Sequence, residues 1–391
     1  MQANPFLGVG LHAVGAFSAA SCYTPQKQTR LWAWEIYWIS QATFAWVILP
    51  IVFAFLTIPN YLDVLAKCPP EAMRNSFLLG VLYGVGGLSF GLGIRYIGFS
   101  LNYAIAIGIS ALLGTLVPLI WDPNKGWTWE IAEKFNTTPG QVILAGIIVS
   151  VGGIALCGWA GALREKSGGS GPSQFSFQRG VPLAILAGVL SSVFNFALIA
   201  GEPIAKAAVA ADAPIKEDDA PIKEDDIEHG ASDLLAMNAI YPFSHGGAWV
   251  ASFVWCAYLI GRNGTKSQFV RLPENGNRSL GFYYLMALLS GAFWYFQFFF
   301  YGMGHANMGE KYGFTSWALH MAMLILFSNF YGYLFREWEG ATTIPKKVLH
   351  AGMAVIVAST LIITYGNYLG EQKSSPPVEK EVPHETVRLD R

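Results

Sequence analysis

The sequence predicts an all-α polytopic membrane protein with ten transmembrane helices, arranged as two five-helix inverted repeats. Three observations predict it. The 391 residues are 53% apolar and only 13% charged, against about 25% charged in a typical soluble domain. Apolar windows of about 20 residues, the length that spans ~30 Å of hydrocarbon, recur along the chain, and the charges gather in the connectors. Because barrel strands would show alternation over ~10 residues instead, the spans are predicted to be helices.

The ten predicted spans cover most of the chain and are joined mainly by short connectors. The first has no Lys or Arg before it and no small-residue cleavage site, so a retained helix is expected rather than a signal peptide. The third and fourth are separated only by the residues around Gly98. The predicted spans cover residues 4–23, 34–58, 74–97, 99–121, 140–163, 180–201, 236–260, 279–304, 312–336 and 346–369.

The Lys and Arg residues of the short loops are shared unequally between the two faces. The loops after odd-numbered spans hold Lys27, Arg30, Arg95, Arg164, Lys166, Arg179, Arg262, Lys266, Arg271, Arg278, Arg336, Lys346 and Lys347. The other short loops hold Lys67, Arg74, Lys125, Lys134 and Lys311. Because short cytoplasmic loops carry the excess of these residues, the odd-numbered loops are predicted to be cytoplasmic, with both termini outside.

The two halves of the chain resemble each other weakly. GAFSAA at 15–20 matches GVLSSV at 188–193, and LYG with GFS (82–84 and 98–100) matches LSG with GFT (289–291 and 313–315). Each half would hold five helices, so the second would be inserted upside down, as in many secondary transporters. Chance in a Gly-rich chain is the alternative. The predicted organisation is a first repeat at 1–163, a cytoplasmic linker at 164–179 and a second repeat at 180–370.

Two polar segments are predicted to be disordered. The long connector 202–233 is acidic and contains a tandem copy, APIKEDD APIKEDD, at 213–226. The tail 371–391 is similarly polar. Neither shows apolar periodicity, so neither is expected to bury a core.

No pattern indicates an enzyme, a metal or a cofactor. A membrane enzyme would need a paired carboxylate, a His-Asp pair or a metal cluster facing one aqueous side, and the sequence shows none. The cysteines, Cys22, Cys68, Cys157 and Cys256, lack disulfide or metal spacing. The net charge of −1 gives no indication of a nucleic-acid partner. A series of glycines on the third span, Gly80, Gly84, Gly87 and Gly91, is interpreted as close helix packing.

Polar and aromatic residues share one face of the eighth span. Trp294, Gln297, Phe298, Tyr301 and His305 follow helical spacing. A sugar offers C–H faces to aromatic rings and hydroxyls to an amide, which can both donate and accept. The stripe therefore suits a neutral polyol. The alternative is that Gln297 holds helices together and that His305 is an interfacial residue.

A second stripe on the second span combines Trp34, Trp38 and Gln41. Its tryptophans would also suit an interfacial belt. Glu35 lies one turn before Trp38, and an ionisable group near membrane depth is a functional candidate by default. Pairing of Glu35 with a cytoplasmic Lys or Arg is the alternative.

Three histidines, His12, His245 and His320, lie near the middle of predicted spans, where no Asp or Glu does. Histidine changes protonation near neutral pH without large perturbation. If protons are coupled to transport, the candidates are His320, His12 and Glu35, and His305 is a further candidate. A packed, hydrogen-bonded histidine is the alternative for each. The buried Asn102 and Asn195 suit either a polar substrate or a neighbouring helix.

Several motifs resemble one transporter family. CYTPQKQTRLWAWEIYW at 22–38 looks like the C-Y-x-P-x-K…W-x-W-E pattern of L-rhamnose/proton symporters. LSGAFWYFQFFFYGMGH at 289–305 and TSWALHM at 315–321 are similar to that family's eighth and ninth helices, and GIRYIG at 93–98 and AIAIG at 104–108 fit as well. The acidic duplication and the polar tail depart from the pattern.

The resemblance implies a ten-helix protein of the drug/metabolite transporter superfamily in a bacterial inner membrane, importing a 6-deoxyhexose such as L-rhamnose with a proton. The expected mechanism is alternating access, with sodium as the alternative ion. Gln297, Trp294, Tyr301, Gln41, Trp38 and Asn102 are the predicted sugar ligands. The rival functions are transport of another sugar or metabolite on the same fold and a sugar sensor that moves nothing.

Overall fold

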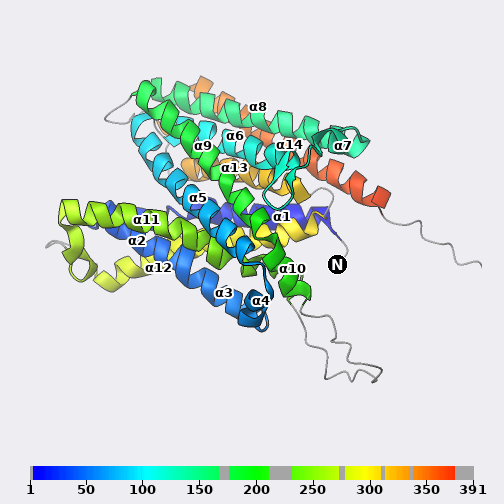
Figure 1. Ribbon diagram of the computed structural model, residues 1–391. Coiled ribbons are helices and arrows are strands. Elements are labelled where there is room, and N and C mark those ends of the chain that lie inside the picture. The colour runs from blue at the N-terminus through cyan, green and yellow to red at the C-terminus, as the bar shows by residue number, and fades with distance from the viewer. Residues whose placement is uncertain are drawn as a thin grey trace, which may run out of the picture.

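The computed structural model describes residues 3–97, 99–166, 176–210, 231–272, 278–309, 313–334 and 338–374. Its long elements are all helices lying side by side (Figure 1). The first half holds α1 (Pro5–Ser21), α2 (Trp34–Thr43), the π-helical segment η2 (Phe44–Ile48), α3 (Leu49–Thr57), α5 (Pro70–Ile97), α6 (Phe99–Leu116) and α8 (Thr138–Lys166). The second half holds α9 (Phe177–Ala200), α11 (Tyr241–Asn263), α12 (Leu280–Asn307), α13 (Ser316–Leu334) and α14 (Thr343–Ser374).

Short elements connect the long helices. They are η1 (Pro25–Gln28), α4 (Tyr61–Lys67), η3 (Val117–Leu119), the antiparallel pair β1 (Trp121–Asp122) and β2 (Gly126–Trp127), α7 (Ile131–Phe135), α10 (Glu202–Ala210), η5 (Ala236–Ala239), η6 (Thr265–Phe269) and η7 (Gly313–Thr315). Local chemistry sets several boundaries. The Asn4 side chain accepts from the Leu7 amide before α1, and the Ser279 hydroxyl accepts from the Phe282 amide at the start of α12. Gly264, at a left-handed φ of 67°, ends α11.

Eight helical segments within the described residues are long and apolar enough to cross a membrane. They include α2, η2 and α3 as one span, Trp34–Thr57. The prediction of an all-α multi-pass membrane protein is therefore confirmed. The remaining long helices, α11 and α13, carry polar residues such as His245 and His320 along their length, which lowers their mean hydropathy. The number of ten spans stays a prediction.

The helices of the two halves are interleaved. In Figure 1, α8 and α14 lie at one edge, with α2, α3, α11 and α12 at the opposite edge. Helix α5 packs on α9 and α11, and α1 packs on α12 and α13. The α8 and α14 pair is antiparallel, because Gly153 lies against Ile356 whereas Ile143 lies against Gly366. Most of the core is therefore built between helices from different halves.

Polar contacts join the span of α2 and α3 to α11 and to the short elements beside them, α4, η5 and η6. At one end, the Glu35 carboxylate accepts from the Asn263 amide (3.0 Å) and the Thr265 hydroxyl (2.9 Å). At the other end, the Asn238 amide donates to the Thr57 hydroxyl (3.0 Å), and the Tyr61 hydroxyl donates to the Ala239 carbonyl (2.9 Å). Between them, indole N–H groups bond hydroxyl groups: Trp38 to Ser252 and Trp249 to Thr43.

The structure corrects the bounds of the segments predicted to be disordered or linking. The predicted connector 202–233 begins with helix α10, which Lys206 and Glu202 stabilise through an ion pair of 2.8 Å. The predicted tail 371–391 begins inside α14, which continues to Ser374. The predicted linker 164–179 is shortened by the ends of α8 and α9. Alanine-rich sequence next to Glu202 supports helix formation, a local propensity that the acidic composition of the connector obscured. The duplicated segment 213–226 lies outside the described residues.

The four glycines of the series on α5 have different surroundings. A Cβ atom at Gly80 would lie 2.0 Å from the Ser244 carbonyl oxygen, and one at Gly84 would lie 2.6 Å from the Ala248 carbonyl oxygen. These two glycines let α5 and α11 approach closely, as predicted. Gly87 and Gly91 have nothing within 4 Å of the same position, so the packing interpretation is wrong for them.

Replacing Gly80 by Val is expected to destabilise the protein. The side chain would meet the backbone of α11, and overpacking of this kind costs about 1–3 kcal/mol. Thermal unfolding in detergent measures the effect, and Gly91→Ala is the matched control on the same helix. Equal unfolding temperatures for the two variants would contradict the close α5–α11 contact.

Candidate functional site

A cavity of about 90 Å³ lies between helices of both halves. Its lining comes from the end of α1, the span of α2 and η2, and helices α5, α6, α9, α12 and α13. The cavity reaches Cys22 and Tyr23, directly after α1 ends, so it extends toward that end of the bundle.

Three tryptophans form much of the cavity wall. The ring centroids of Trp38, Trp46 and Trp294 lie 5.8–6.3 Å apart, with planes at 77–80° to one another. Tyr23 adds a fourth ring, 5.9 Å from Trp294. Among the described residues, the buried indole N–H of Trp46 has no hydrogen-bond partner. An N–H donor buried without a partner costs free energy, which a ligand hydroxyl can recover.

Polar side chains interrupt this aromatic wall. Gln297 on α12, Ser191 on α9, and Tyr83 and Tyr103 on α5 and α6 all line the cavity. Gln297 is buried, one turn after Trp294. Aromatic faces combined with a few amide and hydroxyl groups suit a small neutral molecule with both C–H and O–H surface.

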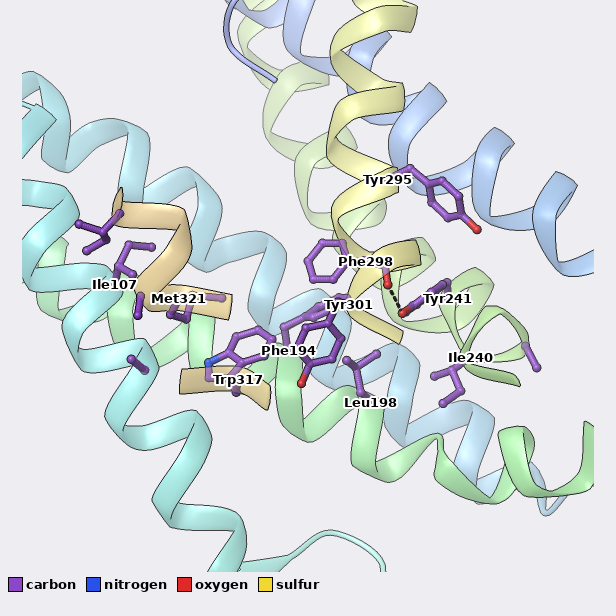
Figure 2. Packing of buried hydrophobic residues seen from close by; sticks show 14 of the residues in the cluster. Ile107, Phe194, Leu198, Ile240, Tyr241, Tyr295, Phe298, Tyr301, Trp317 and Met321 are labelled. Carbon is purple, nitrogen blue, oxygen red and sulfur yellow. Dashed lines mark hydrogen bonds between the residues drawn. The ribbon is translucent and has the colours of Figure 1, made fainter. Parts of the chain in front are cut away.

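Aromatic side chains close the end of the cavity away from Tyr23. The Phe194 ring is fully buried and lies 4.4 Å from Phe298 and 4.5 Å from Tyr83, measured between centroids. Figure 2 shows Phe194, Phe298, Tyr301 and Trp317 gathered where α9, α12 and α13 meet. Their packing closes this side of the cavity, and on the other side the lining ends at Cys22 and Tyr23.

A group of buried imidazoles lies beyond this aromatic layer. His12 of α1 and His320 of α13 are fully buried, with ring centroids 6.0 Å apart. Neither ring nitrogen of either residue has a hydrogen-bond partner in the described part of the chain. Tyr301 lies beside both, at 5.2 Å from His12 and 5.4 Å from His320. Within the described residues, the hydrogen bonds that the alternative interpretation expected for these two histidines are not seen.

Glycine positions make room for these imidazoles. A Cβ atom at Gly304 would lie 3.0 Å from the His12 ring, and one at Gly15 would lie 3.3 Å from the His320 ring. His305, in contrast, has a partner: its Nδ1 lies 3.2 Å from the Ser316 hydroxyl.

The predicted sugar ligands divide into two groups. Trp294, Gln297 and Trp38 line the cavity, whereas Tyr301, Gln41 and Asn102 are not among its lining residues. The Tyr301 hydroxyl donates to the Asn195 amide oxygen (3.3 Å). The backbone carbonyl of Gln41 lies against Gly291 of α12, and the Asn102 amide donates to the Phe90 carbonyl (3.1 Å).

The sequence patterns did not predict several residues that line the cavity, namely Trp46, Tyr23, Tyr83, Tyr103 and Ser191. For Trp46 the reason is local. The π-helical segment η2 has a wider turn than an α-helix, so it rotates the residues after Phe44 away from a constant 3.6-residue period. Trp46 thereby lies beside Trp38, from which an uninterrupted α-helix would turn it away.

Glu35 is the remaining predicted proton carrier. It lies away from the histidines, where α2 begins and α11 ends, and its carboxylate accepts hydrogen bonds from Asn263 and Thr265. Replacing Glu35 by Ala is expected to lower the free energy of unfolding by about 0.5–1.5 kcal/mol, because the exposed Asn263 and the half-buried Thr265 lose their shared acceptor but can bond to water instead. Thermal unfolding in detergent measures it, with Glu71→Ala, exposed in the first turn of α5, as the control. Unchanged stability together with lost proton coupling would instead assign the proton to Glu35.

A multi-pass helical bundle with a small polar and aromatic cavity between its two halves is the arrangement found in many membrane transporters. The chain belongs to the L-rhamnose-proton symport protein family, whose model matches residues 1–216 and 221–368. This confirms the family predicted from the motifs. It also confirms the expectation of a transporter rather than an enzyme.

Curated relatives match over nearly the full chain. A protein of Mannheimia succiniciproducens named L-rhamnose-proton symporter is 32% identical over 367 residues, which cover 94% of this chain and 99% of the relative. Proteins of the same name from Pectobacterium atrosepticum and Yersinia pestis are 31% and 30% identical, over 93% and 92% of this chain and 99% and 97% of their own lengths.

Proposed function

We propose that this protein imports L-rhamnose or a closely related 6-deoxyhexose together with a proton. The observation that carries the proposal is the position of the aromatic and amide-lined cavity next to two buried imidazoles, for which the described residues provide no hydrogen-bond partner. Trp317 connects them, because it lines the cavity and its ring lies 5.8 Å from Tyr301, which contacts both His12 and His320. Family membership and the names of the relatives support the cargo and the ion.

In this proposal the sugar binds between the three tryptophans, with Gln297 and the Trp46 indole pairing its hydroxyls. Trp294 and Trp38 face its C–H surface. Tyr301 contacts the two histidines and is not a sugar ligand in this proposal. Gln41 and Asn102 are proposed to pack helices together. A proton on His12 or His320 favours the sugar-binding state, and its release resets the protein, while Glu35 joins α2 to α11.

Ten spans in two inverted five-helix repeats complete the proposal. The helix pairs support this arrangement, because α1 on α12 and α5 on α9 are equivalent pairs if α9 repeats α1 and α12 repeats α5. Both pairs run antiparallel: Gly8 lies against Gly304 and Gly15 against Gln297, while Gly86 lies against Leu190 and Gly180 against Ile97. Equivalent helices in inverted repeats are expected to make such matching contacts.

We place the protein in a bacterial inner membrane, with the odd-numbered loops in the cytoplasm and both termini in the periplasm. The distribution of Lys and Arg supports this orientation. The cavity then opens toward the cytoplasm, and the layer around Phe194 closes the periplasmic side, so the conformation is inward-facing.

Uptake of labelled L-rhamnose into proteoliposomes tests the proposal. With an inward proton gradient, we expect accumulation above the external concentration and alkalinisation of the medium that depends on rhamnose. Uptake driven by sodium instead would change the ion, and counterflow with other labelled sugars would identify another cargo. Rhamnose binding in detergent without any flux would contradict transport and identify a sensor.

A further inference from the structure

Among the described residues, no carboxylate contacts the two buried imidazoles to balance a proton. No described residue hydrogen bonds to the His12 or His320 ring. The titratable groups that face these rings are His305 and Tyr301 of α12 and, for each histidine, the other, while Glu202 of α10 acts on His305. Helix α6 contains no charged residue, and those of α9 and α14 lie near the helix ends. A proton carried here needs another source of stabilisation, because an isolated buried charge is costly.

Tyr301 offers that source. Its ring centroid lies 5.2 Å from that of His12 and 5.4 Å from that of His320, at interplanar angles of 60° and 89°. A cation that lies over the face of an aromatic ring, within about 6 Å of its centroid, is attracted by the ring's quadrupole, and the attraction grows when water is excluded. Both imidazoles and the Tyr301 ring are buried.

The Tyr301 ring is also held in place. Its hydroxyl donates to the Asn195 amide oxygen, and the Asn195 amide donates in turn to the Gly114 carbonyl (2.7 Å) on α6. The Tyr301 ring also contacts Trp317, whose indole N–H donates to the Ser110 carbonyl (3.0 Å). The ring therefore has a defined orientation between the histidines and the cavity wall.

From this arrangement we infer that the π face of Tyr301 is the counterpart of the transported proton, stabilising the imidazolium form of His12 or His320 in place of a carboxylate. Tyr301 is thus a positioning residue for the proton rather than a sugar ligand. Because Trp317 contacts both Tyr301 and the cavity, a bound sugar that shifts Trp317 changes how strongly the proton is held. This inference rests on the proposed function.

The test measures the external proton concentration that gives half-maximal rhamnose uptake. Tyr301→Leu removes the π face and is expected to raise that concentration about 2- to 30-fold, the range that corresponds to a cation–π interaction. Tyr301→Phe keeps the ring and should stay within about twofold of the wild type. Phe17→Leu, which removes an aromatic ring of α1 that packs on Phe327 and Tyr331 instead, is the control.

A second measurement separates electrostatics from packing. Phenylalanine with one, two or three ring fluorines at position 301 keeps the shape of the side chain while weakening the quadrupole. We expect a stepwise rise in the half-maximal proton concentration. A flat series in a protein whose wild type is proton-driven would overturn the role of Tyr301 alone. A wild type without any proton dependence would overturn both this inference and the proposed coupling.

Discussion

His320→Asn is expected to reduce proton-driven accumulation of L-rhamnose while leaving counterflow of the sugar in place. Asparagine retains a polar side chain but cannot carry a proton near neutral pH. Coupling free energies between two ligands are typically worth 5- to 150-fold in affinity, so gradient-driven uptake should fall by about that factor. Uptake into proteoliposomes with and without an imposed proton gradient measures it.

The control for this experiment is His350→Asn on α14. His350 is exposed and stacks on Tyr333 with centroids 5.4 Å apart, away from the cavity. It should accumulate rhamnose as the wild type does. If His320→Asn and His12→Asn each retained full accumulation, the proton would be carried elsewhere.

Gln297→Ala is expected to raise the half-saturating concentration of L-rhamnose by about 5- to 150-fold. The substitution removes a buried amide that faces the cavity, and a ligand hydroxyl left without its partner costs about 1–3 kcal/mol. Counterflow at varied sugar concentration measures the change without depending on the proton gradient. Gln178→Ala, exposed near the start of α9, is the matched control. An unchanged half-saturation would remove Gln297 from the proposed sugar site.

Composition and span length were sufficient to predict the helical membrane fold, because the bilayer imposes both on any chain that crosses it. The motifs were sufficient for the family. The sequence predicted helix boundaries less well where the local helix propensity differs from the average composition of a segment, as in α10.

The stripe on α12 shows what periodicity can and cannot predict. Trp294 and Gln297 line the cavity. Tyr301 lies on the same helix face, but seven residues after Trp294 correspond to about 10 Å along the axis. At that depth the helix has passed the cavity and contacts His12 and His320. A helix face is visible in a sequence, whereas the neighbours at each depth are set by tertiary packing.

Asn102 illustrates the same limit differently. It is buried, as predicted, but its amide donates to the Phe90 carbonyl of the preceding helix, α5. A buried amide suits a sugar hydroxyl and a backbone carbonyl equally well. Only the packing of α6 against α5 places the Phe90 carbonyl close to the Asn102 amide.

The bonds that join α2 and α3 to α11 at both ends constrain how the protein moves. Sliding the span of α2 and α3 along α11 would break the contacts of Glu35 and of Asn238 together, and it would leave the buried Asn238 amide without its acceptor. We therefore expect these helices to move as one rigid unit in the proposed transport cycle. The contacts of α1 with α12 and of α5 with α9 are close glycine contacts. We expect the two repeats to rock against each other there.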